Sequence, residues 1–359
     1  MKETKVLKQA LGIDVSKDGL SYCLGILRDN LEKEFIQGKE VSNAKKGFKA
    51  LEKWLRIVSC KKGLPVIVME ATGVYHEDIA YYLYNQGYEV CIMQSGRVKK
   101  YAQSLDQRSK TDALDSKMLS MLGCERNLTP WTPPSETLQE LKYLSRERSR
   151  LVKERSIEKN QYHAMNFSSY GYKQAIKRYK KRIGLLNSQI TEIESEMQGI
   201  VNKDIVLSAK INFLTSIPGL SFISVATVVA ETSGFSLFTS GKQLVSYSGY
   251  DVVLRESGNH KGKTKISKKG NKYIRAILHM SSMAAIRLNP TLKPFYDRLK
   301  PRKVKPLIAV VAVQRKLLLL MYSLWKNNQY YDPRYEIKKA ARKQVLAAQD
   351  RSKNEFATS

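Results

Sequence analysis

Four acidic residues have the types and the spacing of a metal-binding set. Asp14 and Glu70 lie in short apolar runs, LGIDVS and VIVMEA, that are typical of buried strands. Asp112 and Asp115 are three residues apart in a segment predicted to be helical, so their side chains share one face. Four carboxylates brought together repel one another unless a cation neutralises them, and a pair of divalent ions does so. Such ions assist the cleavage of phosphodiester bonds, which is the chemistry that this set predicts.

Each acid taken alone could have a purely structural role. A carboxylate in an apolar strand needs a partner, and a structural ion pair would serve. The combination of two strand acids with a helical pair is more specific and favours a metal site. Carboxylate oxygens suit Mg²⁺, with Mn²⁺ as the alternative ion.

The charge of the whole chain points to a polyanionic partner. Its 359 residues include 62 Lys and Arg against 33 Asp and Glu, a formal charge of +29. Nucleic acid is the favoured partner because bound basic side chains release counterions from phosphates. A membrane surface is the rival. No signal peptide is visible, and the longest apolar stretch is interrupted by Gln314, Arg315 and Lys316, so we expect no membrane span and a cytoplasmic location. The four isolated cysteines fit a reducing compartment.

The first 130 residues alternate between strand and helix patterns. Three strands are predicted over residues 11–42, followed by a helix to about residue 58. Next come a strand over 66–71, a helix over 75–86 and a strand over 88–93. A further helix, which Thr111 is predicted to cap, follows. This element order predicts an α/β domain with an RNase H-like (RuvC-like) fold.

Prolines 130, 133 and 134 mark a boundary, after which the pattern becomes helical. We predict a coiled-coil helical arm over 131–210, folded as a hairpin or paired with a second subunit in a dimer or tetramer. Its second helix carries apolar residues that alternate three and four apart. They are Ile176, Tyr179, Ile183, Leu186, Ile190, Ile193, Met197 and Ile200.

A mostly helical domain is predicted over 211–330, with a basic tail over 331–359. The segment IPGL near its start resembles a helix-hairpin-helix element, whose turn amides can hold a DNA phosphate. A basic loop follows, with seven Lys or Arg and no acid between His260 and Arg275.

These motifs together resemble the insertion-sequence 110 transposases, also called DEDD transposases. The matching segments are GIDVSK, MEATGVY and KTDALDSKML around the four acids, then IPGL, LVSYSGY and SGNHKGKTKISKKGNKYIRAIL. The resemblance covers nearly the whole chain. Two positions depart from the family pattern: Ser116, where Ala is frequent, and Asp251-Val252-Val253, where a Leu-x-Pro-like segment is usual.

The resemblance implies a serine transposase domain whose nucleophile matches Ser267 in KISKKGN. It further implies a bacterial or archaeal, nucleoid-associated recombinase that excises and inserts a mobile DNA element and is guided by a structured noncoding bridge RNA. Attack by a serine hydroxyl leaves a phosphoserine that conserves the bond energy for rejoining. Seven basic side chains are expected to hold nucleic acid near the serine. They are Arg255, Lys263, Lys265, Lys268, Lys269, Lys272 and Arg275.

The acids and the serine fall in different predicted domains, so we expect a composite site. Together with the coiled-coil seam, this separation predicts that the site forms only between subunits, so that cutting waits for assembly. Two alternatives stay open. The first is a RuvC-like metal-dependent endonuclease or junction resolvase, which would hydrolyse DNA with water and need no serine. The second is a non-enzymatic nucleic-acid-binding protein, for which the four acids would have no catalytic role.

Overall fold

The computed structural model describes residues 5–60, 63–71, 73–105, 111–253, 256–257, 260–261, 265–302, 305–335 and 338, without the side chains of 256, 257, 260 and 261. The chain divides into two compact units, Met1–Pro133 and Pro134–Ser359. Each unit is described separately below. The division lies beside the prolines that marked the predicted boundary.

A mixed sheet forms the centre of the first unit. Its strands are β1 (Val6–Val15), β2 (Gly19–Arg28), β3 (Lys33–Gln37), β4 (Val41–Ser42), β5 (Val66–Glu70) and β6 (Val90–Met93). The order is β3-β2-β1-β5-β6, with β4 paired to β2. β1, β2 and β3 are antiparallel, whereas β5 and β6 run parallel to β1. The three predicted strands over 11–42 are confirmed, although the third is divided into β3 and β4.

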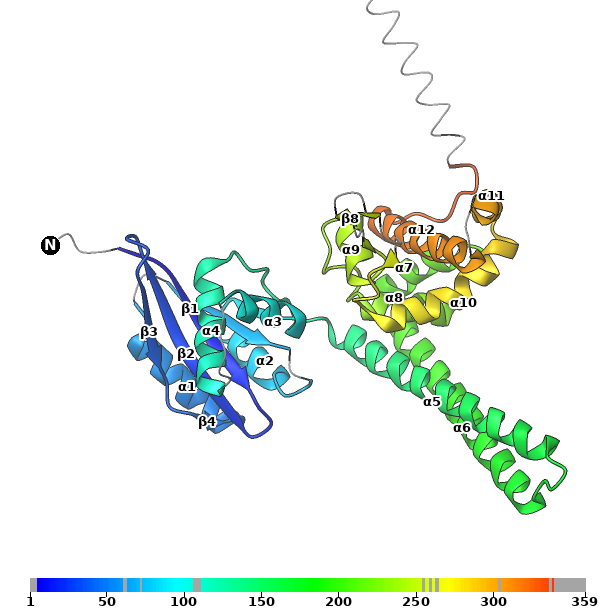
Figure 1. Ribbon diagram of the computed structural model, residues 1–359, viewed down its shortest axis with the longest axis horizontal. Coiled ribbons are helices and arrows are strands. Elements are labelled where there is room, and N and C mark those ends of the chain that lie inside the picture. The colour runs from blue at the N-terminus through cyan, green and yellow to red at the C-terminus, as the bar shows by residue number, and fades with distance from the viewer. Residues whose placement is uncertain are drawn as a thin grey trace, which may run out of the picture. The chain divides into compact units, whose positions relative to one another are not determined.

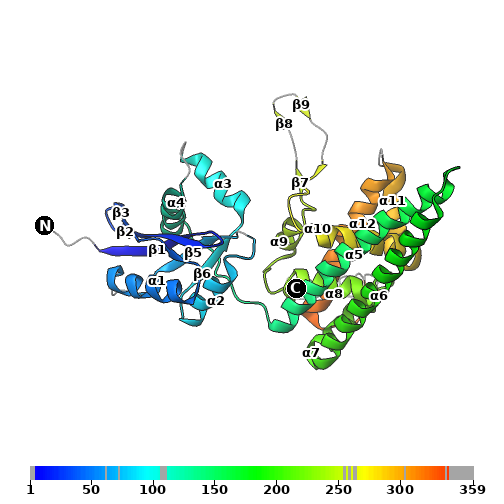
Figure 2. The same cartoon turned by 90° about the horizontal axis from the view of Figure 1, so that it is seen from below.

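Helices cover both faces of this sheet (Figure 2). They are α1 (Lys45–Val58), α2 (Glu77–Asn85), α3 (Ser95–Ser104) and α4 (Asp112–Glu125). α1 and α2 pack on one face, where Leu11, Ile13 and Leu51 belong to the same core. α4 packs on the other face, where Leu119 joins a core with Val68. A strand exposes alternate residues to opposite faces, so the two cores divide β1 and β5 between them.

The second unit is helical apart from short strands around the basic loop (Figure 1). Its helices are α5 (Glu136–Phe167), α6 (Lys173–Lys203), α7 (Ile205–Thr215), α8 (Phe222–Glu231), α9 (Gly241–Tyr247), α10 (Lys272–Leu288), α11 (Leu292–Leu299), η1 (Lys300–Arg302) and α12 (Pro306–Asn327). The strands are β7 (Val252–Val253), β8 (Glu256–Ser257), β9 (His260–Lys261) and β10 (Lys265–Ile266). The mostly helical character predicted for this half is confirmed.

α5 and α6 form a long antiparallel hairpin, whose far end projects from the other helices (Figure 1). Three polar pairs fix its register: Arg148 with Glu194 at 2.6 Å, Arg155 with Asn187 at 3.0 Å and Arg182 with Glu158 at 2.8 Å. The apolar seam of α6 lies along this contact; it is half-buried at Ile183 and buried at Ile190 and Met197. The intramolecular hairpin is one of the two predicted arrangements, and pairing of the seam with a second subunit stays a prediction.

α12 runs through the core of the second unit. Among the described residues it is the one helix long and apolar enough to cross a membrane, and half of its most apolar window is buried inside the unit. Val313, Leu317 and Met321 belong to the same core as Leu278 of α10. The buried face therefore explains the apolar composition of this helix.

Candidate active site

The two strand acids lie side by side at one edge of the sheet. β1 and β5 are parallel, and the last residues of the recorded register are Ile13 and Met69. Asp14 and Glu70 are the next residues of the two strands, so they are neighbours across the pair. Both are half-buried. The register thus joins two acids that are more than fifty residues apart in the chain.

Both strand acids face the side of the sheet that α4 covers. Ile13 and Met69 belong to the core beneath α1 and α2. Side chains alternate along a strand, so the residue after each of these points to the opposite face. Val68, two residues before Glu70, packs against Leu119 on that opposite face. The strand acids and α4 are therefore on the same side of the sheet.

Two glycines show which end of α4 lies near these acids. A Cβ added at Gly12 would be 2.0 Å from the carbonyl oxygen of Ser116, so the helix backbone rests directly on the strand. Nearer the other end of β1, a Cβ added at Gly123 would be 2.6 Å from the Cβ of Ala10. α4 is thus antiparallel to β1. Its first turn lies at the end of the strand that carries Asp14.

That first turn carries the two remaining acids. Asp112 and Asp115 each precede a buried, sheet-facing residue, Ser116 and Leu119 respectively, by one helical turn. The predicted cap is confirmed, because the Thr111 hydroxyl accepts a hydrogen bond from the backbone N–H three residues later at 3.2 Å. Acidic side chains also favour the positive end of the helix dipole. All four acids consequently belong to one edge of the first unit.

The donor chemistry of this edge suits a hard divalent cation, because all four predicted ligands are carboxylates. Among the described residues, however, no three His, Cys, Asp or Glu side chains are grouped closely enough to hold a metal ion. Coordination of one ion by this set would require the carboxylates to turn toward one another. The metal site therefore remains a prediction.

Ser267 lies in a short loop between β10 and α10 of the second unit. Its hydroxyl donates a hydrogen bond of 2.7 Å to Oδ1 of Asp251, and its backbone N–H donates to the Asp251 carbonyl at 2.8 Å. The Ser267 Oγ also accepts a hydrogen bond from the backbone N–H of Lys269 at 3.3 Å. Both side chains of the Ser267–Asp251 pair are half-buried. The candidate nucleophile is thus in direct contact with a potential base.

The sequence reasoning did not predict the contact between Asp251 and Ser267. A carboxylate sixteen residues before the serine has no special spacing, and only the pairing of β7 with β10 brings the two together. The one indication in the sequence was an acid, Asp251, at the start of the short apolar run that precedes the basic loop.

Hydrogen bonds join the turn before Asp251 to the start of the helix that follows the serine loop. Gly249 has a φ of 71°, and a Cβ there would lie 2.8 Å from the Arg275 guanidinium. Arg275 donates to the carbonyls of Ser248 at 3.0 Å and Asn271 at 3.2 Å. Asn271 caps α10 through hydrogen bonds from the N–H groups of Tyr273 and the next residue. These contacts fix the start of α10 and the turn before Asp251 as one structure.

An ion pair between Arg146 and a buried carboxylate supports the Asn271 cap. Glu231 has a fully buried side chain and accepts two hydrogen bonds from Arg146, at 2.6 and 2.9 Å. The amide of Asn271 donates to the same carboxylate at 2.6 Å. The hydrogen bond to Glu231 raises the pKa of the Arg146 guanidinium. A buried carboxylate needs such partners, so this pair has a structural explanation without any catalytic role.

The basic residues predicted around the serine differ in their settings. Four are exposed on the loop and at the start of α10: Lys265, Lys268, Lys269 and Lys272. Arg275 is half-buried and holds backbone carbonyls, as described above. Arg255 and Lys263 lie outside the described residues.

A basic cavity of about 640 Å³ lies between α5 and the beginning of α10. Its lining residues are Tyr143, Arg146, Glu147, Ser149, Arg150, Lys153, Lys272, Tyr273 and Ala276. Four of them are cations, whereas the single acid pairs with one of these, Arg150, at 3.4 Å. Cations beside an exposed aromatic ring, here Tyr143, suit the phosphates and bases of nucleic acid. Sequence reasoning missed the α5 wall because helix packing alone places it beside Lys272.

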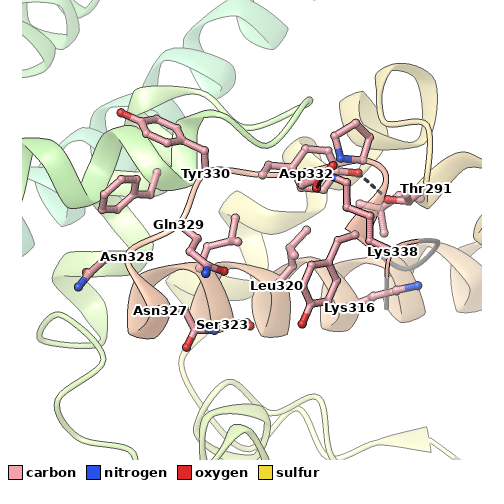
Figure 3. Close-up of a pocket in the computed structure, with 16 residues that line it drawn as sticks. Thr291, Lys316, Leu320, Ser323, Asn327, Asn328, Gln329, Tyr330, Asp332 and Lys338 are labelled. Atoms are coloured by element: carbon pink, nitrogen blue, oxygen red, sulfur yellow. Dashed lines mark hydrogen bonds and ion pairs between the residues drawn. The ribbon is translucent and has the colours of Figure 1, made fainter. Parts of the chain in front are cut away.

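A larger cavity, of about 730 Å³, lies between α12 and the segment that follows it (Figure 3). In Figure 3, Tyr330 and Asp332 lie on that segment, while Leu320 and Ser323 lie on the helix beneath it. The Tyr331 hydroxyl meets the Thr291 hydroxyl at 2.6 Å. None of the described residues that we predicted to be functional lines this cavity. It is the seam along which the segment packs on α12.

Comparison with known proteins identifies the chain. A family model described as "Transposase" matches residues 11–165, and one described as "Transposase IS116/IS110/IS902 family" matches residues 211–297. The pilin gene-inverting protein of Moraxella bovis is 24% identical over 330 residues, which cover 91% of this chain and 98% of that protein. The transposase for insertion sequence element IS1111A of Coxiella burnetii is 25% identical over 311 residues, covering 80% and 79% of the two chains. The four acids lie within the first matched region and Ser267 lies within the second. The chain therefore belongs to the IS110 family of transposases.

Proposed function

We propose that this protein is a DNA recombinase that excises and inserts a mobile element by transesterification at Ser267. The carboxylates supply the cation-binding part of the reaction and the serine supplies the nucleophile. The single observation that carries the proposal is the hydrogen bond of 2.7 Å between the Ser267 hydroxyl and the carboxylate of Asp251, within a loop rich in exposed lysines. A serine needs an adjacent base to become a nucleophile, and this one has a candidate in contact.

The arrangement of the four acids supports the same proposal. A sheet with the strand order β3-β2-β1-β5-β6 and acids at the ends of its two central strands fits the RNase H-like assignment. Asp14 and Glu70 are the strand ligands that we propose, and Asp112 and Asp115 are the helix ligands. A divalent ion bound there would neutralise the carboxylates and polarise a DNA phosphodiester.

The lysines of the serine loop would offset the charge that builds on the phosphate as the serine attacks. Electrostatic stabilisation of this kind requires cations positioned before the reaction begins. Lys268 has a φ of 53°, and its N–H donates to the Gly249 carbonyl at 3.1 Å. The loop backbone is therefore held in place beside the nucleophile.

We further propose that the basic cavity between α5 and α10 binds the sugar-phosphate backbone of the DNA strand. Arg150 and Lys153 line one wall and Lys272 the other, five residues after the serine. A structured bridge RNA encoded by the element would choose the donor and target sites. The excess of positive charge across the chain favours binding of nucleic acid, both DNA and RNA. Sequencing of RNA that copurifies with the protein tests this part independently.

The decisive test compares Ser267→Ala with the unaltered protein on a DNA substrate that traps a covalent intermediate, in the presence of Mg²⁺ and the copurified RNA. We expect a protein–DNA adduct on the KISKKGN peptide in the unaltered protein only. Cleavage at an unchanged rate by Ser267→Ala would contradict the proposal and favour a metal-dependent hydrolase that uses water. Asp14→Asn should abolish cleavage as well, and full recombination by that variant would favour a role in nucleic-acid binding alone.

A further inference from the structure

The contact between Ser267 and Asp251 has the geometry of proton transfer. The distance of 2.7 Å between Oγ and Oδ1 is that of a hydroxyl donating to a carboxylate. The Ser267 N–H also donates to the Asp251 carbonyl at 2.8 Å, so the backbones are joined beside the paired residues Ile266 and Val252. The side chains meet because both residues extend the same two-stranded ladder. Their separation is consequently set by backbone pairing as well as by the side-chain contact.

The hydrogen bonds around Oγ fix the direction of its proton. The Lys269 N–H donates to this oxygen at 3.3 Å, so one lone pair of the hydroxyl is engaged and the proton points to Asp251. Lys265, Lys268 and Lys269, which lie close to the serine in the chain, are exposed. Their positive charge favours the anionic oxygen that forms when the proton departs.

We propose that Asp251 is the general base that activates Ser267, an inference that rests on the proposed function. As Oγ attacks phosphorus, its O–H bond breaks and the proton moves to Oδ1 of Asp251. The Oγ–P bond forms, the bond from phosphorus to the leaving strand oxygen breaks, and that oxygen takes a proton from water. In the rejoining step a strand hydroxyl attacks the phosphoserine and gives its proton to water as the new O–P bond forms. The Oγ–P bond breaks, and Asp251 returns its proton to the departing Oγ. No oxidant, reductant or high-energy cofactor is required.

A purely structural role for Asp251 predicts a different result for one substitution. Asp251→Asn keeps an amide oxygen that can accept the Ser267 hydrogen bond, and it leaves the backbone hydrogen bond unchanged. The loop should therefore hold its shape, whereas the proton acceptor is lost. General-base catalysis contributes roughly 10²- to 10⁴-fold to a rate, so the two roles are far apart in magnitude.

The experiment measures the rate of adduct formation by the full-length protein with its copurified RNA, Mg²⁺ and a trapping DNA duplex. Asp251→Asn should slow the adduct by about 10²-fold or more, with DNA affinity and melting temperature unchanged. Its remaining rate should rise about tenfold per pH unit because hydroxide must remove the proton, while the unaltered protein shows a flatter profile. Asp251→Glu, which keeps a carboxylate, should recover at least part of the loss. Asp332→Asn, the same chemical change on another loop of this unit, should have no effect.

Formation of the adduct by Asp251→Asn within threefold of the normal rate, while Ser267→Ala forms none, would overturn the role of Asp251 and leave the serine mechanism intact. If Ser267→Ala still cleaves normally, the serine mechanism fails, and the base with it. Should Asp251→Asn not fold, the Asp251→Glu variant decides: a folded Asp251→Glu protein as inactive as Ser267→Ala would also overturn the inference.

Discussion

Replacement of Gly12 by Ala is the sharpest test of how α4 positions the acids. The added Cβ would lie 2.0 Å from the Ser116 carbonyl oxygen and 2.3 Å from the Ser120 nitrogen, both backbone atoms that no side-chain rotation can move. Ordinary contact begins at 3.4 Å, so α4 must move away from β1 by about 1.4 Å. Asp112 and Asp115 move with the helix, while Asp14 stays on the strand.

Two magnitudes follow from this shift. Overpacking of a well-filled core costs about 1–3 kcal/mol of the free energy of unfolding. A displacement of about 1 Å at a catalytic group costs on the order of 10²-fold in rate. We expect Gly12→Ala to remain folded with a lower melting temperature, and to cleave DNA about 10²-fold more slowly at a temperature where it is fully folded.

The assay combines thermal unfolding followed by circular dichroism with single-turnover strand cleavage. Gly96→Ala in α3 is the matched control, since a Cβ there meets nothing within 4 Å. It should cleave at the normal rate. The reasoning would be refuted by a folded Gly12→Ala protein that cleaves within twofold of the unaltered rate, because the contact between α4 and β1 would then not set the positions of the acids.

Two further predictions concern DNA binding and stability. Arg150→Glu in the basic cavity should weaken binding to a DNA duplex, because one phosphate contact is lost. The slope of log affinity against log salt concentration should fall by about one in magnitude. Fluorescence anisotropy across a salt series measures both effects. The Tyr82 hydroxyl donates a 2.6 Å hydrogen bond to Glu52 and is the main cause of the lowered pKa of that carboxyl. A lowered pKa in the folded state stabilises the protein above the ordinary value of 4.5 and loses that effect as the pH falls through the folded-state value. Tyr82→Phe should therefore cost about 1.5–3 kcal/mol at pH 7 and progressively less in acid, as measured by urea unfolding between pH 3 and 7.

Each of these predictions has a matched control. Lys49→Glu makes the same charge reversal on exposed α1 and should leave the salt slope unchanged. An equal loss of affinity in both variants would show that net charge, rather than the cavity, governs binding. Tyr84→Phe removes a hydroxyl from a side chain that is 39% exposed and should change stability by less than about 0.5 kcal/mol. If the Tyr82→Phe effect is the same at pH 3 and pH 7, the hydrogen bond to the ionised carboxylate is not its source.

Local pattern predicted most elements of the fold. The strands around Asp14 and Glu70 were visible as apolar runs, and the Thr111 cap was visible from its residue type. α3 was not predicted, because SGRVKKYAQS has only a short apolar repeat. It consists of Val98, Tyr101 and Ala102, and Val98 alone is fully buried. The division of the third strand into β3 and β4 was missed because the sequence EKEFIQGKEVS has the pattern of one extended run. In the structure β2 pairs with two separate parts of it, Lys33–Gln37 and Val41–Ser42.

The sequence by itself determined the four acids, the basic loop with its serine and the helical seam of α6, because each is a matter of residue type and short-range periodicity. The tertiary structure alone decided which residues meet. The register of β1 with β5 places Asp14 beside Glu70. The close contact of α4 with Gly12 places the first turn of that helix at the same edge of the sheet. The pairing of β7 with β10 gave Ser267 its carboxylate partner. These contacts depend on strand pairing and on the packing of a helix against a strand, which residue spacing does not encode.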